Sequence, residues 1–234
     1  IILDKYGADA MRYYMLSSPI VRSEPLNFAE KGVDEIVKKI NNRLLNVVSF
    51  YKMYGAQENA ESDVRPNSDN PLDQWILERL AETGDAVTKG LENYELDRAA
   101  RPIMDFVDDL STWYLRRSRD RFKEQNSLDK NVATKTIAYV LLNLSKLIAP
   151  FMPFLAENIY QKMTGANFQN AKKSAHLLSW PKFTSSHKQV LDEMKTVRNL
   201  VTVALESRDK VGIKVRQPLQ TLFLSAEFEK MDKA

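Results

Sequence analysis

The sequence lacks several residue types on which whole classes of functional site depend. Its 234 residues include no cysteine, which excludes a disulfide framework, a thiolate zinc site, an iron–sulfur cluster and a cysteine nucleophile. The two histidines, His176 and His187, do not have the spacing of metal ligands on one helix, so we expect no metal site. The seven glycines are scattered, and no pair or triad forms a phosphate-binding loop.

A strong net charge and long hydrophobic runs are also absent. The net charge of +3 does not indicate a nucleic-acid partner by itself, so such a signal has to come from local clusters. No apolar run approaches the ~20 residues of a membrane-spanning helix. The first residues, 1–4, show neither a basic region nor an initiator methionine. We interpret the chain as a piece of a longer protein without a targeting signal.

What the sequence has instead is helical periodicity. Apolar residues recur at steps of three and four in four segments, which is typical of helices that bury one face. These stripes are Ile36, Ile40, Leu44, Val47 and Tyr51; Ile103, Phe106, Leu110 and Trp113; Leu141, Leu144 and Ile148; and Val190, Met194, Val197, Val201 and Leu205. Proline and turn residues separate the helices at Ser18-Pro19, Asn70-Pro71, Asn93-Tyr94 and Pro150 to Pro153.

We therefore predict an all-α fold, an antiparallel helical bundle with a short C-terminal α/β element. A strand is predicted after Pro218 from the β-prone residues Leu219, Thr221, Leu222, Phe223 and Leu224. The predicted parts are a connector over 1–27, the bundle over 28–183, and a long helix plus the start of a small α/β subdomain over 184–234.

The strongest candidate site is a basic cluster just after Trp113. It consists of Arg116, Arg117, Arg119, Arg121 and Lys123, with one acidic residue, Asp120. At about 100° per residue, Trp113, Arg117 and Arg121 continue the apolar sector. We expect Trp113 in the core and the two arginines at its rim, pairing with a carboxylate or reaching a base edge or phosphate. The other three basic residues should form a solvated strip that can meet phosphates.

Other interpretations stay open for these residues. All five basic residues can be ordinary surface charges, paired in part with Asp105, Asp108, Asp109 and Asp120. Tyr114 can stack on an exposed base or pack in the core. A second basic patch consists of Lys210, Lys214 and Arg216. It can contact the RNA backbone, or its lysines can simply complement the dipole at a helix C-terminus. We expect His176 to make a structural hydrogen bond. No acid–base pair, triad or metal cage can be assembled, which favours a binding or scaffolding module.

Six segments carry a resemblance to a known family. They are DKYGADAMRYY (4–14), LDQWIL (72–77), WYLRRSR (113–119), LIAPFMPFLAE (147–157), SAHL with WP (174–181) and KVRQPL (214–219). In this order they resemble the C-terminal half of the class I aminoacyl-tRNA synthetases for branched aliphatic amino acids. The first is similar to the segment after the catalytic Lys-Met-Ser-Lys-Ser loop. The third is similar to the Trp-Tyr-x-Arg-Arg-Ser-Arg of the isoleucine enzymes.

The resemblance implies a module that binds the anticodon stem and loop of tRNA(Ile). The parent would be a cytoplasmic isoleucine–tRNA ligase with catalytic and editing domains in cis, using ATP and Mg²⁺ there. This chain lacks the His-Ile-Gly-His and Lys-Met-Ser-Lys-Ser elements, so we expect no catalytic, cofactor or metal residue in it, no aminoacylation by it alone, and no DNA or membrane partner.

The resemblance also gives the basic cluster a role. Arg117 and Arg121 would contribute to anticodon-loop recognition, while Arg116, Arg119 and Lys123 would make positioning contacts. Two alternatives remain: the same module from a valyl-tRNA synthetase, and a non-catalytic helical scaffold for protein partners.

Overall fold

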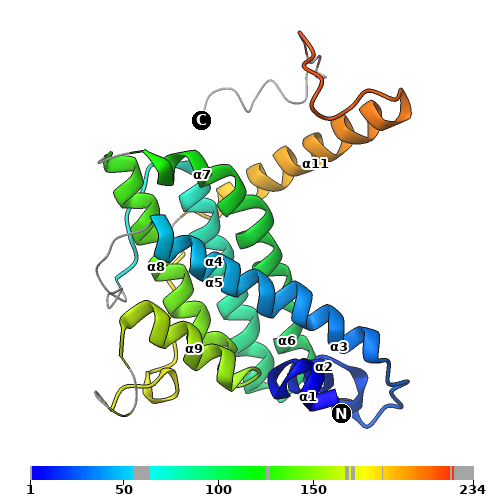
Figure 1. Ribbon diagram of the computed structural model, residues 1–234, viewed down its shortest axis with the longest axis vertical. Coiled ribbons are helices and arrows are strands. Elements are labelled where there is room, and N and C mark those ends of the chain that lie inside the picture. Colours follow the sequence, from blue (N-terminus) through cyan, green and yellow to red (C-terminus); the bar gives the residue numbers. More distant parts are fainter. Residues whose placement is uncertain are drawn as a thin grey trace. The chain divides into compact units, whose positions relative to one another are not determined.

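A computed structural model describes residues 2–54, 64–124, 127–166, 169, 172–185, 187–221 and 223. The chain divides into two compact units, residues 1–186 and 187–234. In the part of the chain that the structure describes, every regular element is a helix and no strand occurs. The predicted all-α helical bundle is therefore confirmed for the first unit (Figure 1).

The long helices of the first unit lie alongside one another. They are α5 (Pro71–Glu92), α6 (Leu96–Asp108) and α8 (Leu128–Ile148). Asn70 caps α5 by accepting a hydrogen bond from the Leu72 amide at 3.0 Å, as its position before Pro71 predicts. A tight turn joins α5 to α6, and Tyr94 adopts φ +58° in it. At Gly90 an added Cβ would lie 2.8 Å from atoms of Ala99, so only glycine permits this close packing of α5 against α6.

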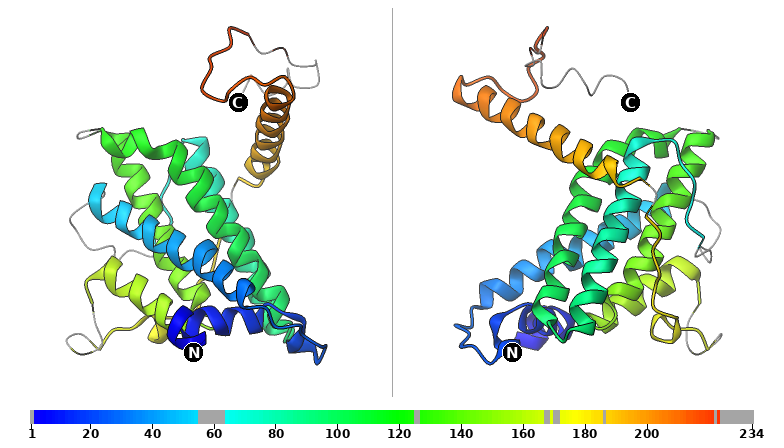
Figure 2. Two further views of the ribbon diagram at one scale, coloured as in Figure 1. Left: turned by 45° about the vertical axis from the view of Figure 1, so that its right-hand side comes forward. Right: turned by 180° about the vertical axis from the view of Figure 1, so that it is seen from behind.

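Two of the helices change their winding midway. α3 (Glu30–Ile36) continues through the π-helical η2 (Val37–Asn41) into α4 (Asn42–Tyr54), and α6 continues through the π-helical η3 (Asp109–Leu115) into α7 (Arg116–Lys123). The helix of α3 and α4 crosses the others obliquely on one face (Figure 2). The core between them is formed by large side chains with almost no exposure, among them Ile40, Leu44, Trp75, Ile76, Leu80, Ile103, Phe106, Leu110 and Phe151.

Short helices close the end of the bundle opposite to α7 (Figure 1). α1 (Ile2–Tyr6), α2 (Ala8–Leu16) and η1 (Pro19–Arg22) precede the long helices, and α9 (Pro153–Thr164) follows α8. The buried carboxylate of Asp9 accepts hydrogen bonds from the amides of Phe154 and Leu155, at 3.3 and 2.6 Å, and so caps the first turn of α9. The Tyr13 hydroxyl donates to the Ala100 carbonyl at 2.6 Å. The N-terminal residues are thus packed into the first unit.

An irregular segment then leads out of the bundle along α5. After η4 (Ala175–Leu177), Trp180 Nε1 donates to Thr88 Oγ1 at 2.8 Å and Ser185 Oγ donates to Glu78 at 2.6 Å. The Phe183 ring lies against Gly84, where a Cβ would meet it at 2.1 Å. These contacts fasten the extended segment to α5.

The second unit begins with α11 (Gln189–Lys210), which is followed by turns. The Arg208 guanidinium donates to the carbonyls of Lys214, at 2.6 Å, and Gln217. The predicted strand is wrong for Leu219, Thr221 and Phe223, which are not in a strand; Leu222 and Leu224 lie outside the described residues. A strand needs a neighbouring backbone to pair with, and the backbone here makes a turn bond, from Gln217 N to Lys214 O at 2.9 Å.

Candidate nucleic-acid interface

The π-helical turn η3 decides which side chains of α7 face the core. Phe106, Leu110, Tyr114, Ser118 and Phe122 all have 0% exposure and follow one another at steps of four. In a regular α-helix, steps of four drift around the axis, but a π turn rotates less per residue because its hydrogen bonds span five residues. The buried face therefore stays on these residues. The prediction that Trp113 belongs to the core is wrong: Trp113 is half-buried, and Tyr114 occupies the core position instead.

Arg121 is anchored between two carboxylates from other helices. It donates to Asp73 in the first turn of α5 through Nη1 and Nη2, at 2.9 and 2.8 Å, and to Asp129 in the first turn of α8 through Nε and Nη2, at 2.7 and 2.6 Å. The buried Asp73 also accepts from Tyr114 Oη at 2.8 Å and from Ser68 Oγ at 2.7 Å. This cluster, Ser68, Asp73, Tyr114, Arg121 and Asp129, is called the Arg121 anchor below.

The Arg121 anchor shifts the pKa values of Tyr114, Arg121 and Asp129. Burial raises the pKa of the Tyr114 phenol well above its ordinary value, and the neighbouring Asp73 carboxylate adds to this shift. Burial opposes the charge on Arg121, but hydrogen bonds to Asp73 and Asp129 outweigh it and raise the pKa of the guanidinium. The hydrogen bond from Arg121 lowers the pKa of Asp129. The anchor thus holds a neutral phenol and a permanent cation.

These contacts contradict the RNA-binding role predicted for two candidate residues, Arg121 and Tyr114. The Arg121 side chain is only 12% exposed, and its N–H groups donate to the carboxylates of Asp73 and Asp129. The Tyr114 ring is fully buried and its hydroxyl is bonded to Asp73. A buried ring cannot stack on a base, and a guanidinium with two carboxylate partners does not present its fork to RNA. We therefore remove both residues from the candidate RNA contacts and assign them to holding α7 in place.

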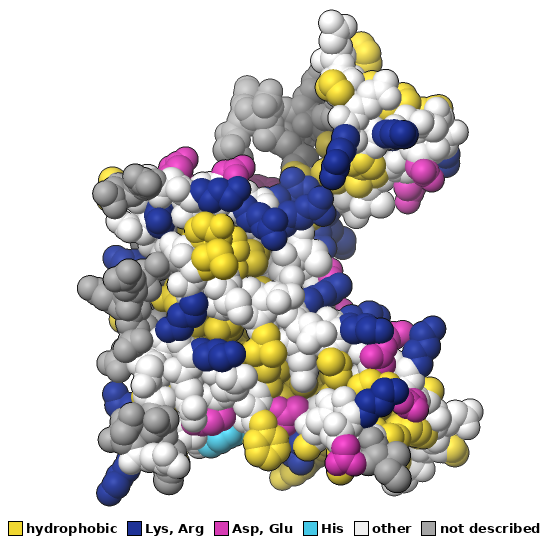
Figure 3. All heavy atoms as spheres, viewed as in Figure 1, with side chains coloured by type: hydrophobic (Ala, Val, Ile, Leu, Met, Phe, Trp, Pro, Cys, Tyr) yellow, Lys and Arg dark blue, Asp and Glu magenta, His cyan; other side chains and the backbone are white. Residues whose placement is uncertain are grey.

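The remaining candidates of α7 lie outside its buried row of Tyr114, Ser118 and Phe122. Arg116, Arg117 and Arg119 are exposed, and none of them forms an ion pair with any residue the structure describes. The Arg117 guanidinium lies over the Trp113 ring, with Cζ 3.8 Å from the ring centroid. Lys123 pairs with the exposed Asp120 at 3.2 Å. Lys and Arg side chains gather over α7 with hydrophobic side chains next to them (Figure 3). We call Arg116, Arg117, Arg119 and Lys123 the α7 basic face.

Two of the carboxylates that the sequence offers as partners pair with other helices. Asp108 pairs with Arg43 of α4, and Asp109 pairs with Arg79 of α5 at 2.9 Å. The interpretation of the cluster as surface charge, paired in part, is wrong for Arg121, which is largely buried, and stays open for the other four basic residues. The sequence analysis did not predict that Asp73 and Asp129 are the partners of Arg121. Their signal was an acidic residue in the first turn of a helix, which many helices show for other reasons.

The second basic patch belongs to the second unit. Lys214 and Arg216 are exposed in the turns after α11, and Arg208 holds this segment through its bonds to the Lys214 and Gln217 carbonyls. The two units are separate compact parts. The two basic patches are accordingly treated as independent candidates.

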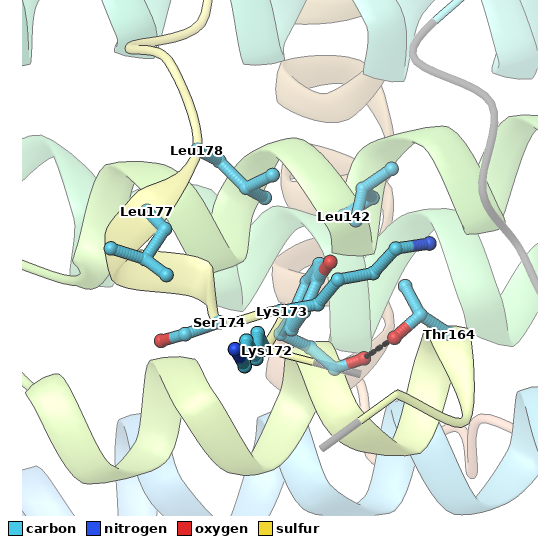
Figure 4. A pocket seen from close by; sticks show the side chains of 8 residues that line it. Leu142, Thr164, Lys172, Lys173, Ser174, Leu177 and Leu178 are labelled. Carbon is cyan, nitrogen blue, oxygen red and sulfur yellow. Dashed lines mark hydrogen bonds between the residues drawn. The ribbon is translucent and has the colours of Figure 1, made fainter. Parts of the chain in front are cut away.

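The rest of the described chain offers no comparable site. A cavity of about 350 Å³ lies beside α8 and α9, lined by Leu142, Leu177 and Leu178 on one side and by Thr164 and two lysines on another (Figure 4). Its hydroxyls are already engaged, since Thr164 Oγ1 donates to the Tyr160 carbonyl at 2.9 Å and Ser174 Oγ donates to Glu157 at 2.7 Å. His176 Nε2 lies 3.1 Å from the Pro153 carbonyl oxygen, which confirms its structural role.

The described residues show neither a metal-binding group nor a membrane-spanning helix. No three acidic or histidine side chains of residues 2–54, 64–124, 127–166 and the later described stretches come together as a metal-binding group. None of the helices in these stretches combines the length and the apolar character that crossing a membrane requires.

Comparison with known proteins identifies the family of this fold and basic face. Residues 73–223 match the family model described as the anticodon-binding domain of tRNA ligase. The match covers more than half of the chain, so the chain belongs to this family. Its N-terminal boundary falls at Asp73, the central residue of the Arg121 anchor.

Curated relatives that match the chain include isoleucine–tRNA ligases. The chain is 35% identical over 236 residues to the isoleucine–tRNA ligase of Chlamydia trachomatis serovar L2, covering 99% of the chain and 22% of that protein. It is 36% identical to that of Chlamydia muridarum and 37% identical to that of Chlamydia pneumoniae, again covering 22% of each. The chain thus spans about a fifth of the length of the curated relatives it matches.

A solved structure shares the fold. The crystal structure of a ternary complex of an Agrobacterium radiobacter K84 LeuRS with tRNA and LeuAMS matches 81% of this chain and 21% of that chain, with a TM-score of 0.54 and 19% identity. At this identity the likeness concerns the helical architecture alone.

Proposed function

We propose that this chain is the anticodon-stem and anticodon-loop binding module of an isoleucine–tRNA ligase. It would position tRNA(Ile) while domains in cis, outside this chain, perform the ATP- and Mg²⁺-dependent aminoacylation and the editing. The family match and the isoleucine–tRNA ligase relatives support the partner. The observation that carries the proposal is the α7 basic face: three exposed arginines without carboxylate partners among the described residues, on a helix that the Arg121 anchor holds rigid.

Geometry and charge suit this face to RNA. Phosphates are met by exposed cations, and arginine adds a planar fork that can bind two phosphate oxygens at once. A rigid helix presents these groups at fixed spacing, so little conformational freedom is lost on binding. Lys123, Lys214 and Arg216 are exposed and would add longer-range attraction for the backbone.

The first experiment measures binding of a fluorescently labelled tRNA(Ile) transcript by anisotropy at about 50 and 200 mM salt. The triple variant Arg116→Ala/Arg117→Ala/Arg119→Ala should raise Kd roughly 100-fold at the lower salt. Three lost contacts of about 1 kcal/mol each, the lower end of the range for one contact, add up to this change. The variant should also flatten the dependence of binding on salt. Wild-type chain with no measurable affinity for tRNA at either salt would refute the proposal and favour the protein-interaction scaffold.

A matched control removes the same charge elsewhere on the first unit. Lys38, Lys39 and Arg98 are also exposed, but each pairs with a carboxylate on or just before its own helix: Asp34, Glu35 and Glu95. The triple variant at these three positions should bind tRNA within about twofold of wild type. An equal loss in both triple variants would mean that only the net charge matters.

Two further measurements address the parts of the proposal that depend on the relatives. Competition with unlabelled tRNA(Ile) and tRNA(Val) transcripts distinguishes the isoleucine from the valine module. An isoleucine-dependent ATP–pyrophosphate exchange assay should detect no turnover by this chain alone.

A further inference from the structure

The Arg117–Trp113 pair differs from every other cation on α7. Arg116 and Arg119 have no side-chain partner among the described residues, Lys123 pairs with Asp120, and Arg121 is bound by carboxylates. Arg117 alone lies on an aromatic ring, 3.8 Å from its centroid. At this distance the guanidinium is in van der Waals contact with the indole, the arrangement in which a cation and a π system attract each other.

The local backbone explains how this contact forms. Trp113 is in the last turn of η3 and Arg117 is in the first turn of α7, four residues later, so both side chains lie on one side of the helix. Trp113 is half-buried, and Arg117 is exposed. The indole thus lies against the guanidinium and leaves Arg117 accessible to solvent.

We infer that Arg117, supported by Trp113, is a stacking platform for an unpaired base of the anticodon loop. This inference rests on the proposed function and makes it more specific. Unpaired RNA bases stack on aromatic rings and on the planes of arginine guanidinium groups. A guanidinium that already lies against an indole loses little conformational freedom when a base stacks on its exposed side. Arg116 and Arg119 lack such a support and would serve as phosphate contacts.

A charge-preserving substitution separates stacking from phosphate contact. Lysine keeps the positive charge but has no plane, so Arg117→Lys removes a stacking surface and leaves an electrostatic contact possible. Arg98→Lys is the matched control, because Arg98 is exposed on α6 and lies outside the α7 basic face. With labelled tRNA(Ile) at about 50 mM salt, Arg117→Lys should raise Kd roughly 5- to 150-fold, the range for loss of one stacked base. Arg98→Lys should stay within about twofold of wild type, since it keeps the charge at a position that pairs with Glu95.

Trp113→Leu supplies a second, independent variant. It keeps an apolar side chain in the half-buried position while removing the ring that supports Arg117. If the two residues act as one platform, Trp113→Leu and Arg117→Lys should each weaken binding, and the double variant should be no weaker than the poorer single variant. Circular dichroism and the thermal midpoint of each variant establish that the fold is intact before binding is compared.

A base analogue reports stacking directly. Transcripts carrying 2-aminopurine at single positions of the anticodon loop should show fluorescence quenching at one position when wild-type chain binds. Quenching at that position should be lost with Arg117→Lys at saturating protein and retained with Arg98→Lys.

The possible outcomes divide cleanly. Normal affinity and quenching with Arg117→Lys, together with weak binding by Arg117→Ala and a salt slope lower by about 1, would make Arg117 a phosphate contact and overturn the inference while the proposed function stands. Full multiplicative loss in the double variant would also overturn the platform. Absence of tRNA binding by wild-type chain would instead refute the proposed function, and this inference with it.

Discussion

Arg117 and Arg121, four residues apart on α7, carry the same guanidinium group in different surroundings. Arg121, next to the buried side of the helix, is held by Asp73 and Asp129, with its side chain 12% exposed. Arg117, one turn earlier, is exposed and lies against an indole. The comparison shows that the availability of a cation depends on carboxylates contributed by distant helices. A local excess of positive charge in the sequence therefore overestimates the number of side chains free to bind a ligand.

The inner face of α7, which carries Tyr114 and Arg121, shows how this helix is held in place. Through Arg121 and Tyr114, α7 is tied to the first turn of α5, and through Asp129 the same guanidinium reaches the first turn of α8. Three helices thus meet at one charged cluster next to the α7 basic face. Breaking the anchor tests whether the two faces have separate functions.

The largest expected effect is on stability, from Arg121→Met. This substitution keeps most of the side-chain volume but leaves the fully buried Asp73 carboxylate without its cationic partner. Removal of one partner of a buried pair costs ~3–5 kcal/mol, and we expect a value near the lower end because Ser68 and Tyr114 still donate to Asp73. Urea denaturation followed by circular dichroism measures the change in the free energy of unfolding.

A double variant sharpens this first prediction. Asp73→Asn together with Arg121→Met removes both charges and should recover part of the loss, since replacing both partners costs less than removing one. Arg98→Ala serves as the surface control and should change stability by less than about 0.5 kcal/mol, because its pair with Glu95 is exposed. If Arg121→Met were as stable as Arg98→Ala, the distinction between the two faces would be lost.

A smaller effect is expected from pH, through Asp129. The hydrogen bond from Arg121 lowers the pKa of Asp129 in the folded state. Stability from this pair is therefore fully present above the unfolded pKa of about 3.9 and is lost as the pH falls through the lower, folded pKa. Asp129 has a side chain 46% exposed, so its contribution should be about 1 kcal/mol or less.

Comparison of wild type with Asp129→Asn isolates this contribution from that of other carboxylates. The difference in unfolding free energy between the two proteins should be constant from pH 7 to about pH 5 and should narrow as the pH falls below about 4. A difference that stays constant down to pH 2.5 or so would show that the Arg121–Asp129 pair does not depend on ionisation of Asp129.

Much of the bundle could be predicted from the sequence, whereas the arrangement around α7 could not. Apolar periodicity in the first unit, the Asn70 cap and the proline breaks depend on nearest neighbours and local geometry, and apart from Trp113 the structure confirms them. On α11 the predicted apolar stripe is wrong in part, because Val197 and Leu205 are 37% and 41% exposed. The prediction of which side chains of α7 are buried depended on one assumption, a constant rotation per residue along the helix. The π turn in η3 breaks it, so Trp113 moves out of the core and Tyr114 moves in.

The pairing of Arg121 was beyond local reasoning for a different reason. Its partners lie 48 residues before it, in the first turn of α5, and 8 residues after it, in the first turn of α8. Only the packing of three helices brings these groups together. The strand predicted after Pro218 failed because β-prone residues form a strand only where a neighbouring backbone pairs with them.

The smallest effect on stability is expected on the outer face, from Arg119→Ala. Arg119 is exposed and has no partner among the residues described here, so its removal should change the free energy of unfolding by less than about 0.5 kcal/mol. Its effect on RNA should nevertheless be measurable. A lost phosphate contact lowers the slope of log Kd against log salt by about 1 and weakens binding to cognate and non-cognate tRNA alike.

Arg121→Met is the informative partner for this measurement, because it also removes one positive charge from α7. A salt slope that stays at the wild-type value in Arg121→Met but falls in Arg119→Ala would separate a structural cation from an RNA-facing one on the same helix. Equal slopes in the two variants would show that burial and ion pairing do not decide which arginines of α7 meet the phosphates.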